Sequence, residues 1–211
     1  MEINRAFVDR IHARARLLRV APRWNGIEGW LSPNEAYALY RYARRLPRGA
    51  TALEIGSWKG KSTYCIARGL RDGRLICVDP FDASGDDFSA ALYTARAGTT
   101  SLREQFEATM TAAGVRERLD VRQGTSDRFV GTVGPLDMIF IDGNHEYEAC
   151  RSDFSGYAPS LRPGGLLLFH DYDPSKPDSG PRMLIDQTIV PSGAYSPIDI
   201  VDSLWIGSKA A

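Results

Sequence analysis

The sequence lacks the features that define several large classes of protein. Its 211 residues contain no apolar run of about 18 residues, so we expect no segment that crosses a membrane. Basic and acidic residues both number 26, so no excess of positive charge favours nucleic acid or an anionic membrane as a partner. With 43% hydrophobic and 25% charged residues, the composition is that of an ordinary globular protein.

Disulfide and metal-binding cysteine patterns are also missing. The three cysteines are Cys65, Cys77 and Cys150, an odd number, far apart and without a CxxC pair. The N-terminal segment is amphipathic and rich in arginine, and it lacks the continuous apolar core of a secretory signal. We therefore expect reduced, buried thiols in a cytoplasmic protein.

Two helices are predicted before the first strand. Apolar residues recur at near-helical spacing over residues 2–19, and we expect this helix to pack on the body or on a second subunit, as in a homodimer. Ser32 and Glu35 form a capping-box pattern that starts the next helix, and Pro47 ends it. Its expected buried stripe consists of Ala36, Leu39, Tyr40, Ala43 and Leu46. We interpret residues 1–48 as a helical cap.

Short apolar segments then alternate with helical ones. The expected strands are TALEI, RLICVD, LDVRQG, LDMIFID and GLLLFHD, and their apolar character predicts burial on both faces. Strands separated by helices form right-handed crossovers and a mostly parallel sheet. The final runs, YSPIDIV and SLWIGSK, predict an antiparallel hairpin. The predicted fold class is α/β, with one Rossmann-like, doubly wound domain over residues 1–211 and a mostly parallel seven-stranded sheet.

One connection is unusually long. Residues 83–99 follow soon after the strand that ends in Asp79, whereas about 2 to 6 residues usually join a strand to the next helix. Since open α/β sheets bind ligands at the carboxyl ends of their strands, we interpret this insertion as a lid or substrate loop.

The loop GSWKGKS, residues 56–62, looks at first like a phosphate-binding loop. However, Gly56 and Gly60 have only three residues between them where that loop needs four, and Ile55 stands in place of the first glycine. Glu54 adds a negative charge beside any bound phosphate. The dinucleotide fingerprint GxGxxG is absent as well. A P-loop-like phosphotransferase is therefore an alternative that the spacing disfavours.

Four motifs in order carry a resemblance to a known family. They are EIGSWKGKS at residues 54–62, VDP at 78–80, IDGNHEY at 141–147, and GG at 164–165 followed by HD at 170–171. The first resembles motif I, ExGxxxGxS, of class I S-adenosylmethionine-dependent methyltransferases. Together the four are similar to metal-assisted O-methyltransferases that act on sugars and other small hydroxylated molecules, including the actinobacterial methylmannose-polysaccharide type.

This resemblance implies S-adenosylmethionine as the cofactor and a sugar, oligosaccharide or similar polyhydroxylated small molecule as the acceptor. An acid at the loop suits a cationic sulfonium, and an acid at the end of the next strand suits the two ribose hydroxyls. The expected cofactor-binding residues are Glu54, Gly56, Ser57, Gly60, Ser62, Asp79, Pro80, Thr125, Ser126 and Asp142. A module that binds the cofactor without catalysis is a further alternative. The Asn/Asp-Pro-Pro-aromatic motif typical of N-methylation is absent.

The chemical centre is expected where two strands end. Asp142 and Asp171 each close a strand of the same sheet, so their carboxylates should meet at one rim, where they suit Mg²⁺ or Mn²⁺. Related enzymes have an acidic pair or an acid beside an amide at the second strand, whereas this chain has His170 beside Asp171. We assign Asp142, His170 and Asp171 as the metal set. A supporting or packing role for His170 stays open.

A catalytic base is expected three residues after Asp142. His145 occupies the offset at which catechol-methylating relatives have a lysine, and an imidazole of near-neutral pKa is a good proton acceptor. The predicted catalytic pair is therefore His145 and Asp142. The alternative is that the ring of His145 orients Asn144 or packs on the cofactor.

Overall fold

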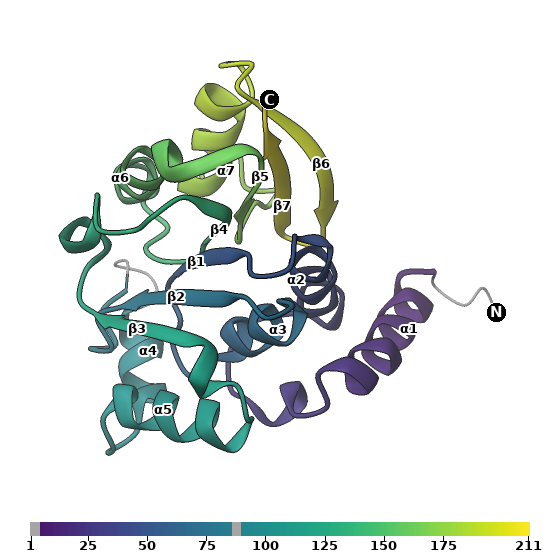
Figure 1. Cartoon of the computed structure of the whole chain (residues 1–211), viewed down its shortest axis with the longest axis vertical. Helices are drawn as coiled ribbons and strands as arrows, with labels where there is room; N and C mark the ends of the chain where they lie inside the picture. Colours follow the sequence, from purple (N-terminus) through teal and green to yellow (C-terminus); the bar gives the residue numbers. More distant parts are fainter. Residues whose placement is uncertain (1–4, 86–89) are drawn as a thin grey trace.

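The apolar segments form one sheet of seven strands in the order β3-β2-β1-β4-β5-β7-β6 (Figure 1). The computed structural model describes residues 5–85 and 90–211. The parallel strands are β1 (Thr51–Ile55), β2 (Arg74–Asp79), β3 (Leu119–Gln123), β4 (Leu136–Ile141) and β5 (Leu161–Phe169). β6 (Tyr195–Val201) and β7 (Leu204–Lys209) form the antiparallel hairpin, and β7 pairs with β5. The predicted fold class is confirmed.

The strand order creates a reversal of winding between β1 and β4. The chain runs from β1 outward to β2 and β3, then returns to β4 beside β1 and continues to β5 on the other side. In open α/β sheets, ligands bind at such a reversal, outside the carboxyl ends of the strands. The segments that follow Ile55 and Ile141 therefore occupy the position at which binding is expected.

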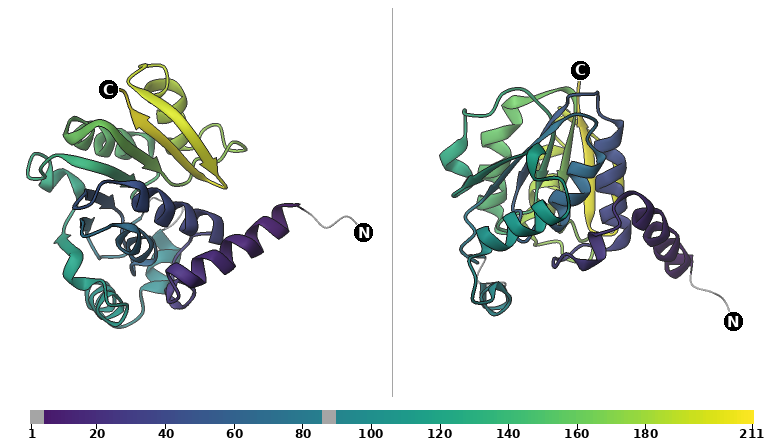
Figure 2. Two further views of the ribbon diagram at one scale, coloured as in Figure 1. Left: turned by 45° about the vertical axis from the view of Figure 1, so that its right-hand side comes forward. Right: turned by 60° about the horizontal axis from the view of Figure 1, so that its bottom comes forward.

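Helices cover both faces of the sheet (Figure 2). The first buried layer contains residues of α2 (Pro33–Arg45), α3 (Lys61–Gly69) and α5 (Leu102–Ala112), and the second contains residues of α6 (Tyr147–Tyr157) and α7 (Gly180–Leu184). Short helical turns are η1 (Trp24–Gly26), η2 (Arg116–Arg118), η3 (Ser126–Phe129), η4 (Ala158–Ser160) and the π-turn η5 (Ile185–Ile189). Burial on both faces explains why the strands are apolar without alternation. The three cysteines are buried and are not joined in disulfides, as predicted.

The start of α2 combines a local motif with a distant contact. Ser32 N donates to Glu35 Oε2 at 2.8 Å, and Glu35 N donates to Ser32 Oγ at 3.2 Å, so the capping box is confirmed. The predicted stripe is wrong at one position, because Tyr42 is buried and Tyr40 only half-buried. The Tyr42 hydroxyl donates to Asp199 on β6 at 3.0 Å, a contact that exists only in the folded sheet.

The first helix, α1 (Arg5–Val20), extends away from the sheet in Figures 1 and 2. Leu17 is fully buried in the core, whereas Ile11 and Leu18 are 51% and 41% exposed. The helix predicted over residues 2–19 is thus present from Arg5, and residues 1–4 lie outside the described chain. Within residues 5–85 and 90–211, no helix has the length and apolarity needed to cross a membrane.

The long insertion contains a helix of its own. α4 (Ala90–Ala97) occupies the second half of the 83–99 segment, and none of its residues is buried. Residues 86–89 lie outside the described chain. The segment is therefore partly helical, where the sequence pattern indicated a loop.

Candidate active site

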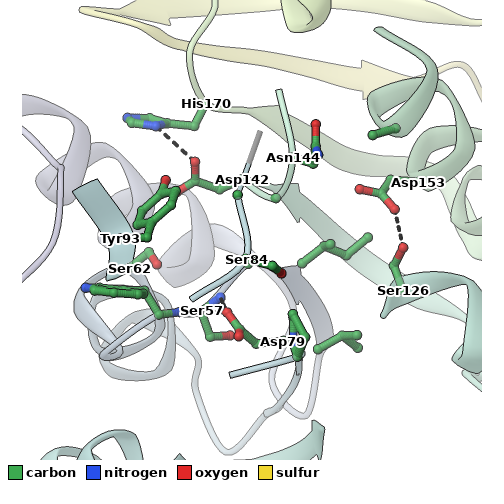
Figure 3. Close-up of a pocket in the computed structure, with 18 of the residues that line it drawn as sticks. Ser57, Ser62, Asp79, Ser84, Tyr93, Ser126, Asp142, Asn144, Asp153 and His170 are labelled. Carbon is green, nitrogen blue, oxygen red and sulfur yellow. Dashed lines mark hydrogen bonds and ion pairs between the residues drawn. The ribbon is translucent and has the colours of Figure 1, made fainter. Parts of the chain in front are cut away.

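A cavity of about 410 Å³ opens at the carboxyl ends of the parallel strands, where the winding reverses (Figure 3). Among the predicted cofactor residues, those that line it are Gly56, Ser57, Ser62, Asp79, Pro80, Thr125, Ser126 and Asp142. His170 and Asp171 line it as well. Glu54, Gly60 and His145 are not part of this lining, although each contacts or supports residues that are.

Gly56 is required by a close approach between two loops. Its φ is +85°, and a Cβ at this position would collide with the backbone carbonyl of Asp142. Gly60 also has positive φ, +93°, and a Cβ there would collide with Met110. The absence of side chains therefore lets the loop after β1 pack directly against the loop after β4 and against α5.

The glycine loop does not form a phosphate cradle. The N–H groups of Ser57 and Trp58 donate to Asp79 Oδ2 at 2.7 and 2.8 Å, and Gly60 N donates to Ser57 O at 2.8 Å. The Lys61 ammonium donates to the carbonyl of Gly29 at 3.1 Å. A phosphate nest needs successive N–H groups that are free to converge on a bound anion, whereas the N–H groups of Ser57 and Trp58 are occupied by the Asp79 carboxylate. The geometry thus speaks against the phosphotransferase alternative.

Glu54 supports the loop from below. It is fully buried and accepts hydrogen bonds from Ser57 Oγ at 2.8 Å and from Thr63 Oγ1. Burial raises its pKa to about 7, because the hydroxyl donors only partly compensate for lost solvation. Glu54, predicted as a cofactor-binding residue, thus lies outside the cavity lining and contacts the loop through Ser57.

Asp79 lies at the end of β2 and lines the cavity beside the glycine loop. In addition to the two loop N–H groups, it accepts from Phe81 N through Oδ1 at 2.6 Å. Burial raises its pKa, against the effect of these N–H donors. A carboxylate has about four acceptor positions. Asp79 therefore retains acceptor capacity toward hydroxyls in the cavity while it holds the loop in shape.

The opposite end of the cavity contains an acid that the sequence analysis did not single out. Asp153 of α6 is 6% exposed, lines the cavity and accepts a hydrogen bond from Ser126 Oγ. Burial raises its pKa to about 6. The available signal was position: Cys150, Asp153 and Tyr157 recur at helical spacing on the buried face of α6, where an acid is unusual.

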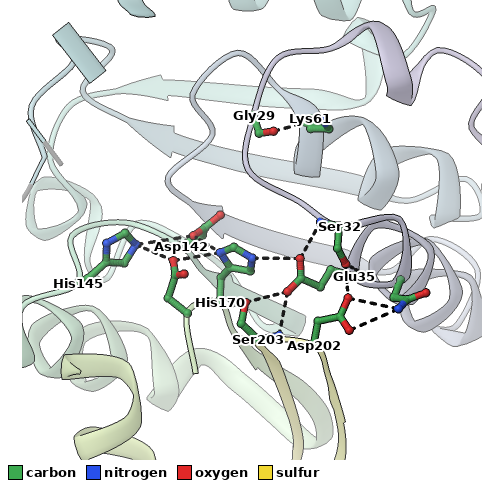
Figure 4. A network of polar contacts seen from close by, with 11 residues as sticks. Gly29, Ser32, Glu35, Lys61, Asp142, His145, His170, Asp202 and Ser203 are labelled. Carbon is green, nitrogen blue, oxygen red and sulfur yellow. Dashed lines mark hydrogen bonds and ion pairs between the residues drawn. The ribbon is translucent and has the colours of Figure 1, made fainter. Parts of the chain in front are cut away.

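Four side chains form an acid–histidine cluster at the ends of β4 and β5 (Figure 4). His170 Nδ1 lies 3.1 Å from Asp142 Oδ1 and 3.1 Å from Asp171 Oδ2. His145 Nε2 lies 3.0 Å from Asp171 Oδ2 and 4.0 Å from Asp142 Oδ1. The predicted metal and base residues are thus brought together. Asp171 has a φ of +58°, a strained conformation that turns the chain sharply after His170.

Glu35 joins this cluster from the N-terminal part of the chain (Figure 4). It is 4% exposed; its Oε2 lies 3.5 Å from His170 Nε2, and its Oε1 accepts from Ser203 N and Oγ at 2.9 and 2.7 Å. These contacts hold its pKa at about 2 despite burial. The sequence pattern predicts only a capping role for Glu35. Nothing local distinguishes such a residue from one that also reaches a distant histidine.

Both histidines of the cluster are held in their charged form. Burial disfavours that charge, but the carboxylates of Asp142 and Asp171 outweigh it and raise the pKa of His145 to about 10. The same carboxylates, with Glu35, raise the pKa of His170 well above its usual value. Burial acts against ionisation of Asp171, yet the two imidazoles lower its pKa. The expected near-neutral pKa of His145 is therefore wrong for this arrangement.

The cluster has the donors that a divalent cation needs. One donor atom each from Asp142, His170 and Asp171 lies within 4.8 Å of the other two. If His170 Nε2–H faces Glu35, the neutral ring presents its Nδ1 lone pair to the two carboxylates. Two carboxylate oxygens and one imidazole nitrogen suit Mn²⁺ somewhat better than Mg²⁺, which prefers oxygen alone. The residues present therefore fit such an ion.

Comparison with known proteins identifies the family. A family model described as a methyltransferase domain matches residues 53–172, which is more than half of the chain. This range runs from the strand before the glycine loop to Tyr172, just beyond the acid–histidine cluster. The chain belongs to this methyltransferase domain family.

Solved structures show the same fold. The chain is similar to cofactor-bound Rv0187 from MTB, with a TM-score of 0.68, 18% identity and coverage of 99% of each chain. The O-methyltransferase TomG from Streptomyces achromogenes, in complex with SAM, has a TM-score of 0.62 and 20% identity over 94% of this chain and 90% of that one. A curated relative, an uncharacterized protein of Acanthamoeba polyphaga mimivirus, is 23% identical over 154 residues. That match covers 70% of this chain and 63% of the viral protein.

Proposed function

We propose that the protein is an S-adenosylmethionine-dependent O-methyltransferase, assisted by a divalent metal, that methylates a hydroxyl of a saccharide or a similar polyhydroxylated small molecule. The observation that carries this proposal is one cavity that joins the glycine loop and Asp79 to the acid–histidine cluster. Membership of the methyltransferase domain family supports it. So does TomG, an O-methyltransferase of the same fold solved with SAM.

The charge of the cavity favours a cationic cofactor over a nucleotide triphosphate. Among the described residues that line it, seven are acidic and one, Lys61, is a lysine. The acids are Glu28, Asp79, Asp82, Asp127, Asp142, Asp153 and Asp171. The sulfonium of S-adenosylmethionine is attracted by such a surface, whereas the phosphates of ATP are repelled. The ribose would lie at Asp79, and the adenine near Pro80, Thr125 and Ser126.

Methyl transfer requires an in-line attack of the acceptor oxygen on the methyl carbon, while the carbon–sulfur bond breaks. The hydroxyl must lose its proton, and we assign its removal to His145. His145 is paired with Asp171, so it accepts a proton only after the carboxylates beside it have been neutralised. A divalent cation bound to Asp142, His170 and Asp171 would supply this neutralisation and would lower the pKa of an acceptor hydroxyl.

Ligand-dependent thermal unfolding tests the cofactor. S-adenosylhomocysteine at a hundred times its Kd stabilises the fold by ~2.7 kcal/mol, whereas ATP at the same concentration leaves the unfolding temperature unchanged. Each ligand is measured with and without Mn²⁺. Stabilisation by ATP with Mn²⁺, and not by S-adenosylhomocysteine, would overturn the proposal. Transfer of a labelled methyl group to a panel of neutral sugars then tests the acceptor.

We also propose that residues 1–211 form one domain, that residues 1–48 cap it, and that the 83–99 segment closes over the acceptor. The exposed apolar side chains of Ile11 and Leu18 on the projecting α1 support a homodimer. Sedimentation at several protein concentrations distinguishes a dimer from a monomer. The variant Ile11→Glu should shift a dimer toward the monomer.

A further inference from the structure

Three aromatic rings form a cluster at one side of the cavity. Trp30, Trp58 and Tyr93 all line it, and their ring centroids lie 5.6 Å (Trp30 to Trp58), 5.0 Å (Trp30 to Tyr93) and 5.2 Å (Trp58 to Tyr93) apart. They come from the segment before α2, the glycine loop and α4, respectively. Three segments far apart in sequence thus bring aromatic side chains together, so the cluster forms only in the folded chain.

Lys59 ties the same three segments together. Its ammonium donates to Glu28 Oε2 at 2.8 Å and to the backbone carbonyl of Arg96, at the end of α4, at 2.7 Å. The side chain of Lys59 is only 12% exposed. The backbone N–H of Trp58 donates a hydrogen bond to Asp79, and Trp58 has a left-handed backbone conformation with a φ of +48°. The aromatic cluster is therefore positioned by charge-assisted hydrogen bonds before any ligand arrives.

Tyr93 places the cluster away from the Ser126 and Asp153 end of the cavity. In Figure 3, Tyr93 lies with Asp142 and His170, whereas Ser126 and Asp153 lie on the opposite side. Groups that are well separated in projection are also separated in space. The end near Ser126 is the one we assign to the adenine of the cofactor. The aromatic cluster is thus left for the molecule that receives the methyl group.

The charges at this end disfavour an anion. Glu28 and Asp82 line the cavity together with the aromatic rings, and Asp142 and Asp171 lie at the reacting end. Lys59 and Lys61 are engaged by protein oxygens, and the Arg96 guanidinium lies 5.8 Å from the ring centre of Trp30. A carboxylate or phosphate on the acceptor would meet several carboxylates, while Lys59 and Lys61 are already bonded to protein oxygens.

We propose that Trp30, Trp58 and Tyr93 form the acceptor subsite, and that it selects an uncharged ring with a flat apolar face and adjacent hydroxyls. This inference rests on the proposed function. A pyranoside and an aromatic diol share this chemistry, because both present a face for stacking and a hydroxyl for the cluster around Asp142. A phosphorylated or carboxylated acceptor is excluded.

Matched probe pairs test the subsite by calorimetric titration into protein saturated with S-adenosylhomocysteine and Mn²⁺. The pairs are methyl α-D-mannopyranoside with mannose 6-phosphate, and catechol with 3,4-dihydroxybenzoate. We expect one neutral probe to bind, and its anionic partner to bind at least about tenfold more weakly. Which neutral probe binds distinguishes a sugar from an aromatic acceptor.

The variants Trp30→Ala, Trp30→Phe and Ile198→Ala localise the effect. Trp30→Ala should weaken the neutral probe about tenfold, Trp30→Phe should restore most of the affinity, and Ile198→Ala, an exposed change on β6, should have no effect. Equal binding of neutral and anionic probes, no binding of any probe, or a Trp30→Ala variant that binds like the wild type would each overturn the subsite. If the wild-type protein does not bind S-adenosylhomocysteine, the proposed function itself would be overturned.

Discussion

The carboxylates at the two ends of the cavity have different partners. Near the glycine loop and α6, Asp79 and Asp153 accept hydrogen bonds from backbone N–H groups and a hydroxyl, and burial raises their pKa values. At the ends of β4 and β5, Asp142 and Asp171 face two imidazoles, and the pKa of Asp171 is lowered. The first end thus holds its carboxylates with uncharged hydrogen-bond donors. The second neutralises its charge internally with protons that a metal ion can replace.

The largest effect should come from removing a carboxylate of the acid–histidine cluster. Asp142→Ala removes a carboxylate shared by His170 and the proposed metal, so Mn²⁺ affinity should fall by more than about a hundredfold and methyl transfer should be lost. Calorimetric titration with Mn²⁺ measures the change. Asp153→Asn, at the other end, is the control and should leave Mn²⁺ binding intact. Metal-independent methyl transfer by Asp142→Ala would contradict the metal assignment.

His145→Ala separates chemistry from binding at the same end. The ring lies outside the lining of the cavity, so the affinity for S-adenosylhomocysteine should stay nearly unchanged. Removal of the base should lower kcat by ~10²–10⁴-fold at neutral pH. The measurement is initial rate with any acceptor that the wild-type protein methylates. Turnover equal to that of the wild type would remove His145 from the role of base.

Gly56→Ala disrupts the contact between the glycine loop and the backbone of Asp142. A left-handed φ costs an alanine about 1–2 kcal/mol, and the collision with the Asp142 carbonyl adds to this, so we expect a loss of about 3 kcal/mol in unfolding free energy. Gly131→Ala is matched, because Gly131 has a φ of +76° and open space around its Cα. It should cost only about 1 kcal/mol. Equal losses in urea unfolding would show that the close approach to Asp142 carries no energy.

Glu54→Gln should change how the unfolding free energy depends on pH. The pKa of Glu54 is raised from its usual 4.5 to about 7 in the folded protein, so between these values the folded chain keeps a proton that the unfolded chain releases. Unfolding therefore becomes easier as pH rises through this window, by at most about 3 kcal/mol from this group. The variant lacks this contribution. Urea unfolding at pH 4.5 and 7.5 should show a smaller decline for Glu54→Gln than for the wild type; parallel declines would refute the shift.

Glu35→Gln should have the smallest effect. The Glu35 carboxylate lies 3.5 Å from His170 Nε2 and stabilises the charge of this ring, so its loss should weaken Mn²⁺ binding about tenfold and leave S-adenosylhomocysteine binding unchanged. Glu148→Gln, an exposed change on α6, is the control. If Glu35→Gln changes the unfolding free energy but not the Mn²⁺ affinity, then Glu35 serves only to stabilise the fold, through its contacts with Ser32 and Ser203.

Local patterns predicted the elements and the chemistry-bearing strand ends. The apolar segments before Glu54, Asp79 and Asp142 identified strands because burial on both faces leaves a continuous apolar signature. The spacing of Gly56 and Gly60 separated the loop from a phosphate cradle, as the hydrogen bonds to Asp79 later explained. Tyr42 and the helix in the insertion were missed, because their positions depend on contacts with β6 and with the aromatic cluster.

The sequence by itself determined that this is a doubly wound α/β protein with acids and histidines where its strands end, because periodicity, capping and turn residues act over a few positions. Only the tertiary structure decided how those groups are paired. Glu35 reaches His170 across 135 positions of sequence, and two carboxylates hold His145 in its charged form. Such pairings depend on distances of a few ångströms between distant segments, and Coulomb and hydrogen-bond energies change steeply over that range.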